Sequence, residues 1–167
     1  REASRCLDCA NPQCVTGCPV GINIPKFIKN IERRHFADAA EALKETSSLP
    51  AVCGRVCPQE KQCESKCIRL KMKQPAVAIG YLERFAADYA RQHTAEATSE
   101  TSAAAEKGKI AVVGSGPAGL SFAGEMARRG YAITVFEALH ATGGVLRYGI
   151  PEFRLPRTVV DAEIDGL

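Results

Sequence analysis

The spacing of eight cysteines constrains this chain of 167 residues more than any other feature of its sequence. They form two blocks, Cys6-x2-Cys9-x4-Cys14-x3-Cys18-Pro19 and Cys53-x3-Cys57-Pro58-x4-Cys63-x3-Cys67. Thiols grouped in this way form disulfides, bind zinc or hold iron–sulfur clusters. Disulfides are the least favoured of the three, because they form in oxidising compartments and nothing in the sequence points to export.

Zinc and iron–sulfur clusters make different demands on the two blocks. Zinc prefers closely spaced cysteine pairs, often with histidine, and needs a tetrahedral set of ligands for each ion. His35, His93 and His140 all lie outside the blocks. A zinc module built from cysteines alone therefore stays as the alternative.

The first block has the form of the bacterial ferredoxin run with a longer middle gap. In that run three closely spaced cysteines hold one [4Fe-4S] cluster, and the fourth, which precedes a proline, binds a second cluster. Cys6, Cys9 and Cys14 then need one partner from the second block, and Cys18 needs three. The spacing therefore favours two [4Fe-4S] clusters over zinc.

The residue that completes the second cluster is left open by the sequence pattern. Counting favours Cys53, since eight thiols are enough for two clusters. Glu83 is the alternative, because it lies beside the apolar stripe of the next predicted helix and a carboxylate can ligate iron. The same side chain could equally face solvent or pair with a nearby Lys or Arg.

The pattern of residues 1 to 93 predicts helices joined by loops that are rich in cysteine and proline. Pro25 opens one helix, with Phe27, Ile28 and Ile31 on one face. A further helix is predicted over 76–91, where apolar residues recur at helical intervals. Residues 94 to 108 are small and polar and predict a linker.

The pattern changes at Lys109, where "KIAVV", "PAGLSFAGEMARRG" and "YAITVFE" predict a strand, a helix and a second strand. Gly114, Gly116 and Gly119 form a G-x-G-x-x-G turn between the first strand and the helix, which suits a pyrophosphate at the helix N-terminus. Glu137 ends the second strand, where a carboxylate can accept hydrogen bonds from a ribose. These features predict a dinucleotide site without separating FAD from NAD.

Composition narrows the possible partners. The 22 Lys and Arg against 19 Asp and Glu leave a formal charge of +3, and no basic run is interleaved with aromatic residues, so nucleic acid is not expected. No apolar stretch is long enough to span a membrane, and the first residues lack the apolar core of a signal peptide. We expect a cytoplasmic protein. We also expect a piece of a longer chain, since it opens on Arg1 and stops inside an unfinished fold.

Both halves resemble one known group of enzymes. The segments "GCPVGINIPKFI", "CGRVCPQE", "AIGYLERF", "VVGSGPAGL" and "GGVLRYGIPEFRLP" are similar to the small (beta) subunit of NADPH-dependent glutamate synthase. Its relatives include the large subunit of the electron-bifurcating ferredoxin:NADP reductase and the N-terminal region of dihydropyrimidine dehydrogenase. The resemblance covers essentially the whole chain.

This resemblance implies a ligand set for each cofactor. It implies that Cys6, Cys9, Cys14 and Cys67 hold one [4Fe-4S] cluster. It implies that Cys18, Cys57, Cys63 and Glu83 hold the other, with Cys53 left out. It also implies FAD at the glycine turn, contacted by Gly114, Gly116, Pro117, Ala118, Gly119, Glu137, Gly144, Val145 and Arg154.

The resemblance also implies the fold and the function. The fold class is α + α/β, with an all-helical iron–sulfur domain over 1–93, a linker over 94–108 and an incomplete Rossmann-like FAD domain over 109–167. In the intact enzyme NADPH would reduce FAD, and electrons would pass through the clusters to the glutamate synthase large subunit or another electron-accepting subunit. The NADPH domain is missing, so we expect the chain alone to be inactive, and no side chain is assigned as an acid or a base. The alternatives are the large subunit of the bifurcating reductase and a zinc-stabilised interaction module.

Overall fold

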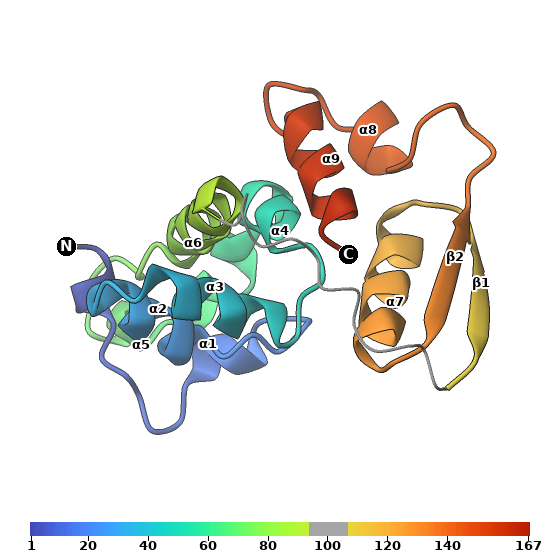
Figure 1. Cartoon of the computed structure of the whole chain (residues 1–167). Coiled ribbons are helices and arrows are strands. Elements are labelled where there is room, and N and C mark those ends of the chain that lie inside the picture. Colours follow the sequence, from blue (N-terminus) through green and yellow to red (C-terminus); the bar gives the residue numbers. More distant parts are fainter. Residues whose placement is uncertain (94–106) are drawn as a thin grey trace. The chain divides into compact units, whose positions relative to one another are not determined.

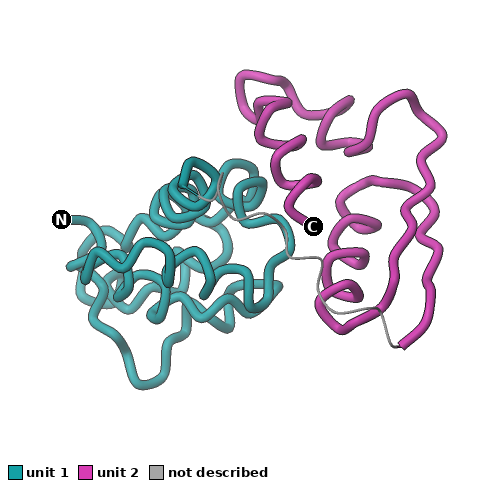
Figure 2. The backbone as a smooth tube through the Cα atoms, in the orientation of Figure 1, with its two compact units in different colours: residues 1–94 teal, residues 95–167 magenta. Residues whose placement is uncertain are grey.

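The computed structural model describes residues 1–93 and 107–167 and divides the chain into two compact units. These units, residues 1–94 and 95–167, have different colours in Figure 2. The first is helical, and the second holds two parallel strands with helices, so the predicted fold class is confirmed. Most of the predicted linker, residues 94–106, lies outside the described residues, and its boundaries stay a prediction.

The first unit contains six helices and three short 3₁₀ turns within its described residues (Figure 1). The helices are α1 (Gln13–Thr16), α2 (Ile24–Glu32), α3 (Phe36–Lys44), α4 (Pro50–Val56), α5 (Ile68–Lys71) and α6 (Ile79–His93). The 3₁₀ turns are Ala3–Arg5, Gln59–Lys61 and Glu64–Lys66. No helix among the described residues is both long enough and apolar enough to cross a bilayer.

The longer helices of this unit form for reasons visible in the sequence. Asn23 caps α2, because its side chain accepts a hydrogen bond from the backbone N–H of Lys26 at 3.2 Å. Pro25 occupies the first turn, where no amide donor is needed. The helix predicted over 76–91 is present as α6, which starts three residues later and ends two residues later.

The core of the first unit lies where α2, α3 and α6 pack together. Phe27, Ile28 and Leu43 are fully buried, with Ile79 and Ala86 from α6 beside them. Cys63 belongs to this core, and four further thiols pack against its edge. The two cysteine blocks therefore border the apolar core that holds the helices together.

The second unit begins as a strand, a helix and a second strand. β1 (Lys109–Val113) and β2 (Ala132–Phe136) pair in parallel, from Lys109 opposite Ala132 to Val113 opposite Phe136. α7 (Pro117–Arg128) connects them and packs against both strands (Figure 1). All three elements agree with the sequence-based prediction.

Two further helices complete the described part of the second unit. They are α8 (Val145–Tyr148) and α9 (Arg157–Asp165), which pack against each other. Leu155 and Val160 are fully buried there. Neither of these helices was predicted from the sequence.

Candidate functional site

The first group of thiols lines one cavity of the helical unit. Cys6, Cys9 and Cys14 reach it from the first block and Cys67 from the second, above apolar side chains that include Ile28. The cavity has a volume of about 80 Å³. A buried water needs only about 10–15 Å³ by the same measure, so the space suits a small inorganic group. These are the four cysteines that the resemblance assigns to one cluster.

Burial makes two of these thiols, Cys6 and Cys14, resist ionisation. It raises the pKa of Cys14 to about 11, and the neighbouring thiols of Cys6 and Cys67 add to the increase. Burial also raises the pKa of Cys6, where the positive charge of Lys29 partly opposes the shift. Lys29 Nζ donates a hydrogen bond to the Cys6 carbonyl oxygen at 2.9 Å. Thiolates can gather here only with a positive group to compensate them, as iron would.

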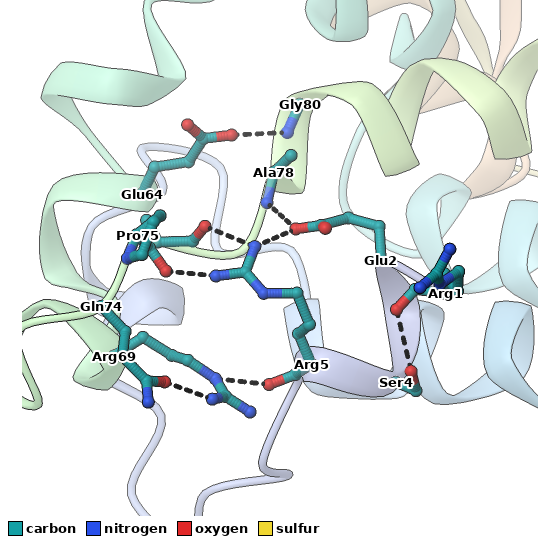
Figure 3. A network of polar contacts seen from close by, with 11 residues as sticks. Arg1, Glu2, Ser4, Arg5, Glu64, Arg69, Gln74, Pro75, Ala78 and Gly80 are labelled. Atoms are coloured by element: carbon teal, nitrogen blue, oxygen red, sulfur yellow. Dashed lines mark hydrogen bonds and ion pairs between the residues drawn. The ribbon is translucent and has the colours of Figure 1, made fainter.

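A polar network joins Arg5, which precedes Cys6, to residues that follow Cys67 (Figure 3). Arg5 Nη1 donates to the carbonyl oxygen of Ala76 at 3.0 Å, and Nη2 donates to that of Pro75. Arg69, two residues after Cys67, donates through Nε to the Arg5 carbonyl oxygen at 2.8 Å. The chain segments before Cys6 and after Cys67 are thereby fastened together.

The same network caps the start of α6. Glu2 Oε1 accepts a hydrogen bond from the backbone N–H of Ala78 at 2.9 Å. Glu64 Oε1 accepts one from the N–H of Gly80 at 3.0 Å (Figure 3). Carboxylates are favourable at this end of a helix, because its N–H groups lack intrahelical partners. Sequence reasoning missed Arg5, Arg69 and these caps, although both arginines lie close to cysteines in the sequence.

The second group of side chains gathers around Glu83, which lies on α6 and is only 5% exposed. Burial raises the pKa of Cys63 to about 12, and the charges of Glu64, Glu83, Cys18 and Cys57 raise it further. Burial raises the pKa of Cys57 as well, followed by the charges of Glu83 and Cys18. The structure thus brings together Cys18, Cys57, Cys63 and Glu83. Several acidic groups converge here, which favours a positively charged occupant.

Cys53 lies on the helix that leads to Cys57. It is on α4, four residues before Cys57, and its carbonyl oxygen accepts a hydrogen bond from Gln59 Nε2 at 3.0 Å. It is not among the main groups that raise the pKa of Cys57 or Cys63. Glu83 does act on both Cys57 and Cys63, and the choice between Glu83 and Cys53 as a ligand stays a prediction.

Gly17 lets the two cysteine blocks meet. A Cβ atom at this position would lie 2.9 Å from the carbonyl oxygen of Gln62 and 3.2 Å from the Cα of Cys63. Gly17 precedes Cys18, so a larger residue here would push the first block away from the second. The crossed grouping of thiols depends on this close approach.

The described donor side chains do not form a site for a single metal ion. Within residues 1–93 and 107–167, no three or more His, Cys, Asp or Glu side chains stand close enough together to hold one metal ion. A tetrahedral zinc site needs such convergence. In a [4Fe-4S] cluster each thiolate binds a different iron at a separate corner, so the ligands surround a larger group.

The glycine turn of the second unit has the geometry that a phosphate site requires. Gly114 has a φ of +94°, which only glycine adopts without strain, and Gly116 opens α7 with Pro117 at the first helical position. A Cβ at Gly119 would collide with the carbonyl oxygen of Gly114, so the helix and the turn lie in direct contact. Ala118 occupies the first turn of α7, where backbone N–H groups are available to an anion.

The second glycine pair lies against this turn. A Cβ at Gly144 would lie 2.8 Å from the Cα of Gly116, and the N–H of Gly143 donates to the Ser115 carbonyl oxygen at 3.1 Å. Val145 begins α8 directly afterwards and is 55% exposed. Arg154 is exposed in the connection between α8 and α9, and its place at a flavin stays a prediction.

Ser115 and Glu137 join the parts of this site. Glu137 Oε2 accepts hydrogen bonds from the hydroxyl and the backbone N–H of Ser115, the latter at 3.0 Å, and Oε1 accepts one from the N–H of Leu139 at 2.9 Å. These bonds, led by that from the Ser115 hydroxyl, lower the pKa of Glu137 to about 2. Ser115 is fully buried, and sequence reasoning missed it because the motif treats its position as variable.

Two protein families match this chain. Residues 1–95 match the family described as dihydropyrimidine dehydrogenase domain II, 4Fe-4S cluster. Residues 112–161 match the family described as NAD(P)-binding Rossmann-like domain. The first match covers the unit that contains all eight cysteines.

Individual relatives align with almost the whole chain. The NAD-dependent dihydropyrimidine dehydrogenase subunit PreT of Escherichia coli K12 is 44% identical over 98% of this chain and 39% of its own length. The glutamate synthase [NADPH] small chain of the same organism is 40% identical over 95% of this chain and 33% of its own length. A putative oxidoreductase of that organism, UacF, is 41% identical over 95% of this chain and 25% of its own length.

These relatives are all considerably longer, since the chain spans 39% or less of each. The predicted relationship to the glutamate synthase small subunit and to dihydropyrimidine dehydrogenase is confirmed. With a family match over more than half of its length, this chain belongs to the iron–sulfur family that includes domain II of dihydropyrimidine dehydrogenase and the small chain of glutamate synthase.

Proposed function

We propose that this chain is the electron-transfer part of a flavin and iron–sulfur oxidoreductase. The observation that carries the proposal is the crossed grouping of side chains in the helical unit. Each group draws on both cysteine blocks, and each contains thiols whose pKa is raised by burial, which favours a positively charged occupant. A dinucleotide turn follows in the same chain, which supplies the second half of an electron-transfer pathway.

Each cluster has its own ligand set in this proposal. The first cluster is held by Cys6, Cys9, Cys14 and Cys67. The second is held by Cys18, Cys57, Cys63 and Glu83, and Cys53 is not a ligand. The burial of Glu83 beside two thiols with raised pKa values supports its role.

FAD is the proposed occupant of the glycine turn. When bound, FAD would accept a hydride from NADPH and release single electrons, and the clusters would relay them. The amides at the start of α7 would hold the pyrophosphate, and Glu137 would bind the ribose. Gly144, Val145 and Arg154 would extend the contact surface along the flavin.

Three candidate activities differ in the partner subunit and the final substrate. Glutamate synthase activity, with the large subunit as electron acceptor, is the first. Dihydropyrimidine dehydrogenase activity is the second, and it is favoured by the 44% identity to the bacterial subunit of that enzyme, against 40% for the glutamate synthase small chain. The bifurcating reductase is a third member of the same group. Co-purification of the native protein with its partner subunit separates these candidates.

Anaerobic reconstitution with iron and sulfide tests the shared proposal. We expect about eight iron and about eight sulfide per chain, with absorption typical of [4Fe-4S] clusters. Glu83→Ala should lose one cluster, whereas Cys53→Ala should retain both. Tight zinc binding with no uptake of iron would overturn the redox proposal and favour the interaction module.

A further inference from the structure

Arg55 lies on α4 between Cys53 and Cys57, and its side chain is only 4% exposed. Nη2 donates to both carboxylate oxygens of Asp88, at 2.7 and 2.8 Å. Nη1 donates to the carbonyl oxygen of Ala51 at 3.0 Å. Since Asp88 is on α6, this guanidinium fastens α4 to the helix that carries Glu83.

This ion pair is better suited to fix a position than to stabilise the fold. A buried ion pair contributes little net stability, because desolvation offsets the attraction. Nε of Arg55 is also buried without a hydrogen-bond partner among the described residues, which adds a cost. The planar guanidinium, however, is held at two points, by Ala51 through Nη1 and by Asp88 through Nη2, so it fixes the distance of Asp88 from α4.

Gly54 brings the two helices into direct contact next to Glu83. A Cβ at Gly54 would lie 2.7 Å from the backbone nitrogen of Arg84 and 2.8 Å from its Cα. The missing side chain therefore sets how closely α4 approaches α6. Arg55 is the next residue along α4, and Cys57 follows at the end of that helix.

The other arginines near Asp88 cannot do this. Arg84 Nε and Arg91 Nη2 lie 3.7 and 3.6 Å from the carboxylate oxygens of Asp88, but both arginines are on α6 itself. The Arg84 side chain is 51% exposed. Of these three arginines, only Arg55 connects Asp88 to another element.

We propose that Arg55 is a positioning residue for the second cluster. Through Asp88 it holds α6 at the position and rotation that bring Glu83 to Cys57 and Cys63. This inference rests on the proposed function, in which Glu83 is an iron ligand. It adds a residue outside the ligand set whose loss should affect one cluster and spare the other.

The test is anaerobic reconstitution of the whole chain with iron and sulfide, followed by iron analysis and electron paramagnetic resonance of the reduced protein. Arg55→Met keeps an unbranched side chain in the same space and removes the paired hydrogen bonds. Arg84→Met is the matched control, because it removes an exposed cation beside the same carboxylate. We expect Arg55→Met to bind about half the iron of the wild type and to lose the signal that Glu83→Ala loses. Arg84→Met should retain both signals.

Two further variants sharpen the result. Arg55→Lys keeps the charge but has one nitrogen in place of the two that bind Asp88 and Ala51, so we expect partial retention of iron and a shifted second signal. In Arg55→Met combined with Asp88→Asn, the loss should not exceed that of Arg55→Met alone, because both changes break one interaction. Additive losses would contradict action through Asp88.

The outcomes separate this inference from the proposed function. If the wild type binds no iron, or Glu83→Ala retains both clusters, the proposed function itself fails. If Glu83→Ala loses one cluster but Arg55→Met retains both with an unchanged spectrum, only the positioning role is wrong. Equal loss of both signals in Arg55→Met would also overturn it, since that result indicates a general structural role. If Arg55→Met loses helical circular dichroism, electron paramagnetic resonance of the single variant Asp88→Asn is the deciding measurement. A change confined to the signal of the second cluster supports the positioning role, and an unchanged resonance spectrum overturns it.

Discussion

The candidate sites of the two units differ in whether the structure stabilises the charged form of their side chains. In the helical unit, side chains from distant segments converge on sites where burial and neighbouring charges raise the pKa of Cys14 to about 11 and that of Cys63 to about 12. In the second unit, hydrogen bonds lower the pKa of Glu137 to about 2, so its charged form is already stabilised. The first arrangement needs its occupant, whereas the second is formed without one.

This contrast follows from how each site is built. The glycine turn, Glu137 and Gly143 are joined through Ser115 by bonds that span at most 28 residues, and the backbone supplies most donors. The cluster sites depend on contacts between segments more than forty residues apart, such as Gly17 against Cys63. A site assembled over such distances loses its geometry when the charges inside it are not balanced.

The largest expected effect comes from leaving out iron and sulfide. Without clusters, we expect amide hydrogen exchange in α2, α3 and α6 to accelerate on the order of 100-fold or more, because a tightly bound group stabilises only the folded state. Exchange in β1 and α7 should stay within a few-fold. Equal protection of the helical unit with and without clusters would contradict the contrast between the units.

The next effect concerns the contact between the cysteine blocks. Gly17→Val places a branched side chain where even a Cβ would lie 2.9 Å from the Gln62 carbonyl oxygen, so we expect a loss of about 1–3 kcal/mol and reduced iron uptake at both sites. Iron content and the midpoint of urea unfolding measure this. The neighbouring exposed Thr16→Ala should change stability by less than about 0.5 kcal/mol.

A matched change in the second unit should leave the clusters intact. Gly144 has a φ of +52° and would place a Cβ 2.8 Å from Gly116, so Gly144→Ala should destabilise this unit by about 1–3 kcal/mol. We expect weaker FAD binding in the intact protein and an unchanged iron content. Loss of iron in this variant would show that the two sites are not built independently.

Sequence patterns predicted the elements that have a clear periodicity. The strand over 109–113 agrees with β1, and the helix over 76–91 differs from α6 by a few residues at each end. α9 was missed, because its apolar residues pack against parts of the unit that no local pattern reveals. Patterns in the local sequence therefore predict periodic helices and strands, but not a helix whose burial depends on packing against other segments.

The candidate sites were predictable only in part, for a similar reason. Spacing predicted that the blocks share ligands, and counting favoured Cys53 over Glu83. In our proposal the choice depends on which face of α6 meets Cys57, and contacts of Gly54 and Arg55 on another helix set that face. Ser115 was overlooked because its burial follows from a turn closing on Gly143, 28 residues away.

The iron-free helical unit should lose stability in alkaline solution. Thiols with folded pKa values of about 11 and about 12, above the usual value of about 8.5, hold their protons more tightly in the folded state. Stability is therefore full below about pH 8.5 and declines as the pH rises through the folded values. Urea unfolding under reducing conditions measures this, and Cys14→Ser with Cys63→Ser should flatten the pH dependence.

The smallest effect, and the sharpest test of the preformed site, lies at Glu137. Its folded pKa of about 2 is below the ordinary glutamate value of about 4.3, so its contribution to stability is present above about pH 4.3 and is lost as the pH falls through about 2. Carboxyl chemical shifts in an acid titration report this pKa directly. Ser115→Ala removes the strongest of the hydrogen bonds and should move the midpoint toward the ordinary value. A wild-type midpoint near the ordinary value would mean that the turn does not hold Glu137 before a nucleotide binds, and the second unit would then depend on its occupant as the first does.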